Sequence, residues 1–445
     1  MTTDARTRPF RALGIRNFRQ FAAGQVVSVA GTWMMVVAQD WLVLELTGNS
    51  ATALGTVTAL QFTPMLLFTL HGGRLADRYD KRALLLAANL LSGLLALLLA
   101  VFVLTGTAGL TDVHVFAFCL GMVNAVEVPT RMAFVGELVP PELLPNASAL
   151  SAAYFNVARV AGPAAAGLLL TVLGTGWVMS VNALSYLATV VALRRIRPGE
   201  LYRTARAPGR TRVTDGLRYV RGRPDLMIPF ALVAGVGLFG LNFQLTLPLL
   251  AKTVFHTDAS SFGLLTTVFA AGSLTAAFLT TARTARPSAR LVTVSALVFG
   301  VMEAAVGWAT GYPAVVVLLF LTGGASVYFA QAANHRIQLG SDPLYRGRVL
   351  ALYTLILQGS TPLGALMVGY VAEARGARSA FVVGGLASLG TGLVALCLRA
   401  GRSGPGPLDL TGDSHGACTG RTPGSRAAAA DQRDPVRRDH GDPSR

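Results

Sequence analysis

Charged residues, lysine and cysteine are all scarce in this sequence. Only 13% of the 445 residues are charged, whereas a typical soluble domain has about 25%, and 52% are hydrophobic. Lysine occurs only as Lys81 and Lys252, and neither follows a glycine, so the chain lacks the phosphate-binding loop of ATP-driven pumps. The three cysteines, Cys119, Cys397 and Cys418, are far apart, which argues against disulfides and cysteine-based metal sites.

Signals for enzymes and nucleic-acid binders are missing as well. The sequence has no H-E-x-x-H motif, and its apolar stretches leave no room for a separate water-soluble catalytic domain. The net charge of +16 comes from arginines in short polar segments, without the interleaved aromatic residues that stack on bases. We therefore expect no enzyme, no cofactor, no metal and no nucleic-acid partner.

Long apolar stretches separated by short polar breaks make up most of the chain. A membrane-spanning helix needs about 20 apolar residues to cross roughly 30 Å of hydrocarbon. We expect such helices at 18–46, 51–72, 83–105, 113–138, 147–173, 177–193, 225–251, 261–282, 291–310, 313–339, 348–372 and 380–398. The sequence therefore predicts an all-α membrane protein with 12 transmembrane helices.

Basic residues are distributed unequally between the two sides of these predicted helices. On one side they occupy 74–82, 194–223, 283–290 and 346–348, whereas the other side has only Lys252, Arg375 and Arg378. Lysine and arginine near helix ends resist translocation, so the basic side should face the cytoplasm. We expect a multi-pass protein of the cell membrane, surrounded by the lipid bilayer, with both termini cytoplasmic.

The predicted helices divide into two groups of six that repeat one plan. Each group has a basic loop after its second helix and a proline inside its fifth, Pro163 and Pro362. We expect a basic cytoplasmic N-terminus at 1–17, a six-helix bundle at 18–194, a linker at 195–224, a second bundle at 225–400 and a disordered tail at 401–445. Val213, Leu217 and Val220 are spaced as on one helix face, so the linker should contain an amphipathic helix.

The strongest local motif runs from Gly73 to Arg82 and reads G-R-L-A-D-R-Y-D-K-R. It resembles the G-x-L-A-D-R-x-G-R-K loop of the major facilitator superfamily, with Asp80 in place of the second glycine. The triplet P-T-R at 129–131 and the segment 137–147 are similar to the branch of bacterial secretion permeases that includes the enterobactin exporter. The resemblance covers nearly all of the chain except the tail. It implies the major facilitator superfamily fold, with two pseudo-symmetric six-helix bundles.

In this resemblance, the residues Gly73, Asp77, Arg78 and Arg82 belong to a gating loop. Glycine permits a tight turn between helices, and Asp77 can cap a helix or pair with an arginine across the gap between the bundles. The resemblance implies that such a contact latches one conformation. The alternative is a positively charged anchor without a switching role.

The segment 158–167, within the fifth predicted helix, resembles the G-x-x-x-G-P-x-x-G-G motif of proton-coupled antiporters. It retains Gly162, Pro163 and Gly167, while two of the usual glycines are alanine. Small residues allow close helix packing, and proline removes a backbone hydrogen bond. The resemblance favours export over import, with ordinary small-residue packing as the alternative.

Several charged residues lie within predicted helices, where a charge needs a partner, water or the interior of the bundle. Glu127 and Arg131 are one helical turn apart and should form an ion pair. Arg159 needs an anion, for which Glu127 and Asp40 are the candidates. We expect Asp40 or Glu127 to take up and release a coupling proton, with a fixed salt bridge as the alternative. For Glu303 we expect a supporting role.

In the resembling fold, the first, fourth, seventh and tenth helices line a central cavity. A lining of amide and aromatic side chains suits an amphipathic organic solute better than a bare ion. The candidates besides Glu127 are Trp33, Gln39, Asn124, Asn242, Gln244, Tyr328, Gln331 and Asn334.

Together these features predict a monomeric secondary transporter that works by alternating access. Its expected activity is the export, in exchange for protons, of a small amphipathic organic molecule such as a drug-like compound, a siderophore or a secondary metabolite. Uptake by proton symport is one alternative. A membrane sensor that keeps the fold without transporting solute is another.

Overall fold

The computed structural model describes residues 10–202, 213–281, 285–342 and 345–400. Within these ranges the chain is helical without β-strands, and 12 segments are long and apolar enough to cross a membrane. The predicted all-α fold and the number of spans are therefore confirmed. Residues 1–9 of the predicted N-terminus, 203–212 of the predicted linker and the whole predicted tail lie outside the described residues.

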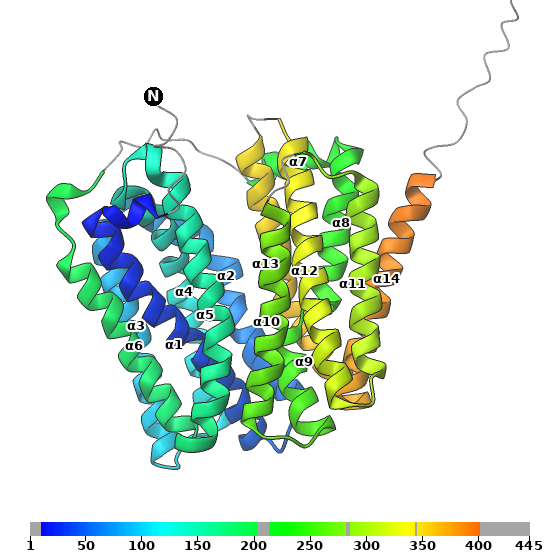
Figure 1. Ribbon diagram of the computed structural model, residues 1–445, viewed down its shortest axis with the longest axis horizontal. Helices are drawn as coiled ribbons and strands as arrows, with labels where there is room; N and C mark the ends of the chain where they lie inside the picture. Colours follow the sequence, from blue (N-terminus) through cyan, green and yellow to red (C-terminus); the bar gives the residue numbers. More distant parts are fainter. Residues whose placement is uncertain (1–9, 203–212, 282–284, 343–344, 401–445) are drawn as a thin grey trace, which may run out of the picture. The chain divides into compact units, whose positions relative to one another are not determined.

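The helices pack as two bundles, which stand side by side in Figure 1. The first bundle consists of α1 (Arg16–Leu46), α2 (Ala51–Arg78), α3 (Lys81–Leu104), α4 (Leu110–Leu138), α5 (Leu144–Leu173) and α6 (Thr175–Arg195). The second consists of α8 (Pro224–Phe239), α9 (Phe243–Leu249), the π-helical turn η4 (Leu250–Val254), α10 (Ala259–Thr281), α11 (Ala289–Trp308), α12 (Tyr312–Gly340), α13 (Arg346–Arg375) and α14 (Ala377–Ala400). The short helix α7 (Val213–Arg221) lies between them in the sequence.

The arginine-rich segments fall at one end of the described helices, which we call the basic side. It carries the start of α1, the turn between α2 and α3, the helix α7 and the start of α13, and it lies at the top of Figure 1. The other end, the opposite side, carries the turn between α1 and α2 and the end of α13. Each of the 12 spans therefore runs between these two sides.

Local sequence explains where several helices begin and end. The Ser50 hydroxyl accepts a hydrogen bond from the third residue of α2 (3.2 Å), and the Ser288 hydroxyl does the same for α11 (3.1 Å). The fifth span of each bundle ends at a glycine with positive φ, Gly174 at 82° and Gly376 at 85°. Because other residues rarely adopt this conformation, glycine permits the immediate turn into the next helix at the same place in both bundles.

The seventh span is not one helix, so the prediction of a continuous helix over 225–251 is wrong. α8 ends at Phe239, the residues Gly240 to Asn242 interrupt the helix, and α9 begins at Phe243. Asn242 Nδ2 donates hydrogen bonds to the carbonyl oxygens of Leu238 (2.9 Å) and Phe239 (3.2 Å). The amide thus satisfies carbonyl groups that the interruption deprives of helical partners. We call α8, α9 and η4 together the split span.

Two seams join the bundles, and each pairs the second span of one bundle with the fifth span of the other. In the first seam, Gly55 of α2 lies against the Ala365 carbonyl oxygen of α13, where an added Cβ would be only 2.6 Å away. In the second, Gly263 of α10 lies against the Pro163 carbonyl oxygen of α5, at 2.5 Å. Real Cβ atoms do not come so close, so glycine is needed for the backbones to approach this far.

A carboxylate strengthens the first seam at the opposite side. Oε2 of Glu373, near the end of α13, accepts hydrogen bonds from the N–H groups of Ala51 (2.6 Å) and Thr52 (3.1 Å) and from the Ser50 hydroxyl (3.1 Å). These groups form the N-terminus of α2, where unpaired N–H groups and the helix dipole favour a negative charge. Glu373 therefore caps a helix of the other bundle.

An aromatic contact also joins the bundles near the opposite side. The Trp41 ring of α1 stacks on Phe262 of α10, with centroids 6.3 Å apart and planes inclined by 17°. The Lys252 ammonium of the split span lies 4.6 Å from the centre of the Trp41 ring, within cation–π range. Trp41 Nε1 donates a hydrogen bond to Glu45 (2.7 Å). The ring is thus fixed between elements of both bundles.

Replacing Glu373 by alanine should favour a form in which the opposite side is open, because the variant loses a cap that exists only when the seam is closed. A helix cap contributes about 1 kcal/mol, which corresponds to roughly a fivefold change in population. Spin labels at positions 107 and 310, which are exposed on the opposite side of the two bundles, can report this change. We expect the share of long distances in pulsed electron paramagnetic resonance to rise about fivefold.

The matched control is Asp258→Ala, because Asp258 caps α10 within its own bundle. Its carboxylate accepts hydrogen bonds from the Ser260 hydroxyl (2.7 Å) and the Ser261 N–H (3.1 Å), and the Ser260 hydrogen bond lowers the pKa of Asp258. This variant should keep the wild-type distances. Equal distance distributions in Glu373→Ala and wild type would show that the cap does not hold the seam closed.

Candidate functional site

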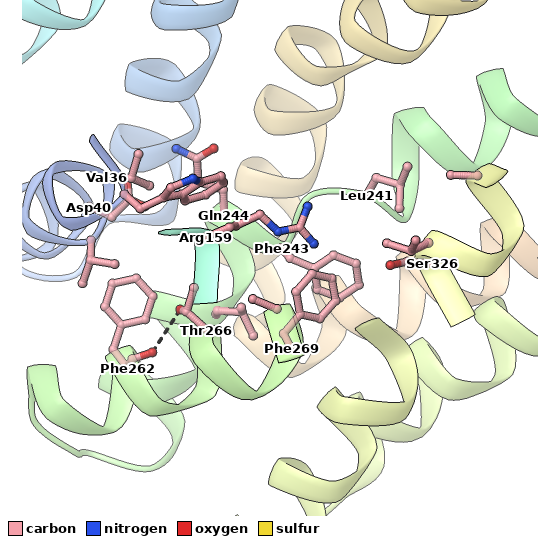
Figure 2. Close-up of a pocket in the computed structure, with 16 residues that line it drawn as sticks. Val36, Asp40, Arg159, Leu241, Phe243, Gln244, Phe262, Thr266, Phe269 and Ser326 are labelled. Atoms are coloured by element: carbon pink, nitrogen blue, oxygen red, sulfur yellow. Dashed lines mark hydrogen bonds between the residues drawn. The ribbon is translucent and has the colours of Figure 1, made fainter. Parts of the chain in front are cut away.

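Two adjoining cavities lie between the bundles, and both are lined by α1 and by the split span. The first has a volume of about 280 Å³ and the second of about 310 Å³. Trp33, Val36 and Gln244 line both, so they form the wall where the cavities meet. Figure 2 shows the first cavity, in which Asp40 and Arg159 lie among mostly apolar residues.

Asp40 of α1 is the carboxyl group of the first cavity. It is 1% exposed, and neither of its oxygens has a hydrogen-bond partner among the described residues. The cavity also contains Arg159 of α5, which forms no ion pair within the described part of the chain. Two groups of opposite charge therefore border one apolar space without neutralising each other at close range. Such groups are costly unless a proton, an ion or a solute compensates them.

The second cavity contains an ion pair. Arg131 Nε lies 2.9 Å from Glu127 Oε1, one turn away on α4, and both side chains are largely buried. This is the pair that their spacing of four residues predicts. The charge of Glu127 is therefore already compensated, whereas that of Asp40 is not.

Three of the predicted lining residues border these cavities or lie beside them in the first bundle. Trp33 lines both cavities, and Asn124 of α4 lines the second. Gln39 is buried and donates a hydrogen bond to Gln61 (3.3 Å), which lines the second cavity. Gln39 thus orients a lining amide and does not line either cavity itself.

The predicted lining residues of the second bundle are placed differently. Gln244 of α9 lines both cavities, whereas Asn242 caps the end of α8 with its side chain. Tyr328 lines a separate, apolar pocket between α10, α11 and α12. Gln331 and Asn334 are half-buried on α12 and line neither cavity. On this helix, Ser326 faces the first cavity instead.

Several polar lining residues lie on helices that the sequence analysis did not assign to the cavity. Asn89 and Ser92 of α3, Tyr186 of α6 and Gln358 of α13 all line the second cavity. Asn89 and Ser92 are three residues apart in an otherwise leucine-rich helix, so they share one face. That spacing is the signal by which the α3 residues could have been found.

The predicted gating loop is mostly helical. α2 continues through Gly73 to Arg78, so Gly73 makes no turn, and an added Cβ there would meet nothing within 4 Å. The turn consists of Tyr79 and Asp80, and the Asp80 carboxylate accepts a hydrogen bond from the Ala83 N–H (2.9 Å). The expected glycine turn is therefore wrong. Asp80, the departure from the usual motif, is the N-cap of α3.

The neighbouring basic residues bind within the first bundle. Lys81 Nζ lies 2.6 Å from Glu137 Oε1 at the end of α4. Arg82 donates hydrogen bonds to the carbonyl oxygens of Leu193 (2.7 Å) and Arg194 (3.0 Å) at the end of α6. These contacts tie α3 to its own bundle. The gating role of Asp77 and Arg78 stays a prediction.

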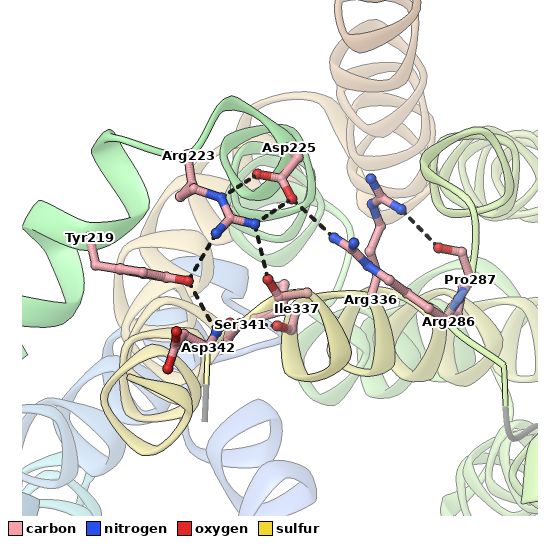
Figure 3. A network of polar contacts seen from close by, with 10 residues as sticks. Tyr219, Arg223, Asp225, Arg286, Pro287, Arg336, Ile337, Ser341 and Asp342 are labelled. Atoms are coloured by element: carbon pink, nitrogen blue, oxygen red, sulfur yellow. Dashed lines mark hydrogen bonds and ion pairs between the residues drawn. The ribbon is translucent and has the colours of Figure 1, made fainter. Parts of the chain in front are cut away.

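The basic side of the second bundle is also held together by its own residues (Figure 3). Asp225, at the start of α8, binds Arg223 (3.0 and 3.2 Å) and Arg286 (3.1 Å). The Tyr219 hydroxyl of α7 accepts hydrogen bonds from Arg223 (3.2 Å) and from the Asp342 N–H (3.1 Å). The helix α7 is therefore anchored to the second bundle.

The residues of the antiporter-like motif pack α5 against both bundles. An added Cβ at Gly162 would lie 2.5 Å from Trp33 Cβ of α1, and one at Gly167 would lie 3.0 Å from the Ala259 carbonyl oxygen of α10. Pro163 lies inside α5, which continues to Leu173. These contacts show close small-residue packing, whereas a role of the motif in proton coupling stays a prediction.

Comparisons with known proteins agree with this architecture. The family described as transmembrane secretion effector matches residues 7–403. The chain is 26% identical over 388 residues to the multidrug efflux pump Tap of Mycolicibacterium fortuitum, covering 83% of this chain and 92% of that protein. It is 24% identical over 390 residues to the staphyloferrin A transporter of Staphylococcus aureus, covering 83% and 93%. Among solved structures, a bacterial homologue of the human lysosomal transporter Spinster, inward-facing and unoccupied, superposes with a TM-score of 0.67 at 15% identity, covering 86% and 95%.

Removing one partner of the Glu127–Arg131 pair should destabilise the protein, because it leaves the other charge uncompensated inside the bundle. We expect Glu127→Gln or Arg131→Gln alone to lower the free energy of unfolding by about 3 kcal/mol. The double variant should lose clearly less than the sum of the two. Unfolding in mixed detergent micelles measures these differences.

The pair Arg197 and Glu200 provides the control, because these side chains are also 2.9 Å apart but are 61% and 48% exposed. Substitutions there should cost less than about 1 kcal/mol. Additive effects of Glu127→Gln and Arg131→Gln, within about 0.5 kcal/mol, would contradict the expected coupling.

Proposed function

The chain belongs to the transmembrane secretion effectors of the major facilitator superfamily, and from this membership we propose that it exports a small amphipathic organic molecule in exchange for protons. It is a multi-pass membrane transporter and not an enzyme. The transport direction, the coupling ion and the class of solute are the parts that we propose.

The main support for proton exchange is the unpartnered Asp40 beside Arg159 in the first cavity. In an exchanger, a proton and a solute occupy one site in turn. A buried carboxyl group without a fixed counter-ion can hold a proton, and after releasing it can attract a polar or cationic group of the solute. Glu127 is less suited, because Arg131 already compensates its charge. We therefore assign the exchangeable proton to Asp40.

The cavity walls support an amphipathic solute. Trp33, Phe62 and Phe155 offer aromatic surface in the second cavity, and Asn124 and Gln244 offer amide groups. Sites for drug-sized ligands measure about 300–1,000 Å³ and combine apolar walls with a few polar groups. The resemblance to a multidrug efflux pump and to a staphyloferrin A transporter supports an organic solute, and the efflux pump also supports the export direction.

We also propose that the basic side faces the cytoplasm, as the distribution of arginines favours. Both termini would then be cytoplasmic. The seams, the Glu373 cap and the Trp41 contact would close the outer side, so this arrangement would be the inward-facing one. The similarity to an inward-facing transporter structure supports this assignment. Export would require the seams to part while the basic ends of the bundles approach each other.

Asp40→Asn should abolish transport driven by a proton gradient, because asparagine cannot release a proton. Purified protein in liposomes, with a fluorescent amphipathic dye as solute, provides the measurement. Wild type should accumulate the dye against its concentration gradient when a proton gradient is imposed. Asp40→Asn should lose this accumulation entirely and still exchange dye for dye without a gradient, since the cavity remains.

Glu127→Gln separates the two candidate carboxyl groups. Compared at equal amounts of folded protein, because breaking the pair with Arg131 lowers stability, this variant should still accumulate dye when a proton gradient is imposed. If Glu127→Gln lost gradient-driven accumulation and Asp40→Asn kept it, the exchangeable proton would be assigned to Glu127 instead of Asp40. Full accumulation by both variants would refute proton exchange at either residue. Movement of dye and protons in the same direction would indicate symport, and dye binding without flux would indicate a sensor.

A further inference from the structure

A second carboxyl group lies buried without a partner, away from both cavities. Glu303 of α11 is 3% exposed, and its Oε2 atom has no hydrogen-bond partner in the described part of the chain. Among the carboxyl groups that the structure describes, only Asp40 and Glu303 have buried oxygens in this condition. The exchange of proton and solute at Asp40 does not involve Glu303.

Two glycines leave space for the Glu303 carboxyl group. At Gly240, in the interruption of the split span, an added Cβ would lie 2.9 Å from Glu303 Oε2. At Gly384 of α14, an added Cβ would lie 2.6 Å from Glu303 Oε1. A side chain at either position would occupy the space of the carboxyl group. The carboxyl group therefore sits in a cradle between α8, α11 and α14.

Other oxygen atoms face the same cradle. The position of an added Cβ at Gly240 is also 2.7 Å from Ser388 Oγ, a fully buried hydroxyl without a hydrogen-bond partner. The corresponding position at Gly384 is 2.8 Å from the Phe239 carbonyl oxygen, at the end of α8. A carboxyl group, a hydroxyl group without a hydrogen-bond partner among the described residues, and the Phe239 carbonyl group thus face one small space. The Phe239 oxygen accepts one hydrogen bond from Asn242 and keeps a second lone pair.

Among the side chains that the structure describes, no basic group forms an ion pair with Glu303. Arg290 lies at the start of α11 itself, and Arg378 of α14 donates a hydrogen bond to the Ala309 carbonyl oxygen (2.6 Å). Up to residue 398, the titratable or charged residues on the helices packed against α11 are Asp225 on α8, Tyr312, Tyr328, His335 and Arg336 on α12, and Arg378 and Cys397 on α14. Within the described residues, none of them forms a hydrogen bond or an ion pair with Glu303.

We propose that Glu303, Ser388 and the Phe239 carbonyl group form a binding site for one monovalent cation, a proton or a sodium ion. A single positive charge compensates the carboxylate, which in these surroundings has no other counter-charge. The carbonyl groups at the end of a broken membrane helix provide further oxygen ligands for such an ion. One carboxylate supplies one negative charge, so the site favours a monovalent over a divalent ion.

The proposed site and the first cavity share the interruption of the split span. Gly240 borders Glu303, whereas Leu241, Phe243 and Gln244 line the first cavity (Figure 2). A cation bound at Glu303 therefore holds one end of the segment that forms the cavity wall. When the cation leaves, the uncompensated Glu303 carboxylate lies against residues 240–242. The occupancy of the site is therefore linked to the shape of the cavity that the following residues line.

Infrared difference spectroscopy on the purified full-length protein in nanodiscs tests this site directly. Because Asp40 is itself a buried carboxyl group that can be protonated, the spectra are recorded in the Asp40→Asn variant. This variant should still show the C=O band of a buried, protonated carboxyl group. For a proton site, alkaline buffer should remove the band; for a sodium site, sodium but not choline should remove it at constant pH. The double variant Asp40→Asn/Glu303→Gln should lack the band. A band that is insensitive to pH and sodium, or that survives in the double variant, would overturn the proposal.

Ser388→Ala provides a second test that leaves the glutamate in place. Loss of one hydrogen-bonding ligand should weaken the binding of the cation about tenfold, seen as a shift of the pH or sodium titration of the band. An unchanged titration would remove Ser388 from the site. These spectra need neither solute nor gradient, so the cation site and the export function can fail independently.

Discussion

Access to the space between the bundles depends on how closely four helices approach each other at the two seams. Helices in lipid gain little from the hydrophobic effect, so they associate through close backbone packing, and glycines at positions 55 and 263 permit it. Meanwhile Lys81, Arg82 and Asp225 bind partners within their own bundles. The seams can therefore part and close again while each bundle moves as a unit, which alternating access requires.

Inside a membrane protein, a charged side chain needs a partner. A carboxyl group without one therefore marks a place where a proton, an ion or a solute can bind. Glu127 and Glu137 have basic partners at 2.9 and 2.6 Å, as expected for charges inside a membrane protein. Asp40 and Glu303 have no such partner among the residues that the structure describes. The interruption of the split span lies near both, because Gly240 borders the Glu303 carboxyl group and the residues after it line the cavity that contains Asp40. The broken helix thus lies near both of the described carboxyl groups, Asp40 and Glu303, that can bind a proton or a cation from outside the protein.

Much of this fold could be predicted from the sequence, because membrane spans depend on local apolar length and the Glu127–Arg131 pair depends on a local spacing. The interruption at 240–242 was missed, since it is stabilised by the Asn242 side chain and by neighbouring helices, which hydropathy does not report. The extension of α2 past Gly73 was missed because a motif glycine was taken for a turn. The cap formed by Glu373 joins residues more than 300 positions apart and leaves no local signal. Likewise, only a supporting role is predicted for Glu303 from the sequence, because the glycines beside its carboxyl group come from other helices and are seen only in the structure.

The position of Trp41 has a practical consequence. The chain has four tryptophans, of which Trp177 and Trp308 are 57% and 67% exposed on the outer surface of the bundles. Trp33 lines both cavities, whereas Trp41 is held between the bundles under the Lys252 ammonium. Indole emission depends on nearby charge and hydration. With the other three indoles replaced by phenylalanine, intrinsic fluorescence would follow the parting of the bundles in real time, and retaining Trp33 instead would follow the arrival of solute, in both cases without an attached dye.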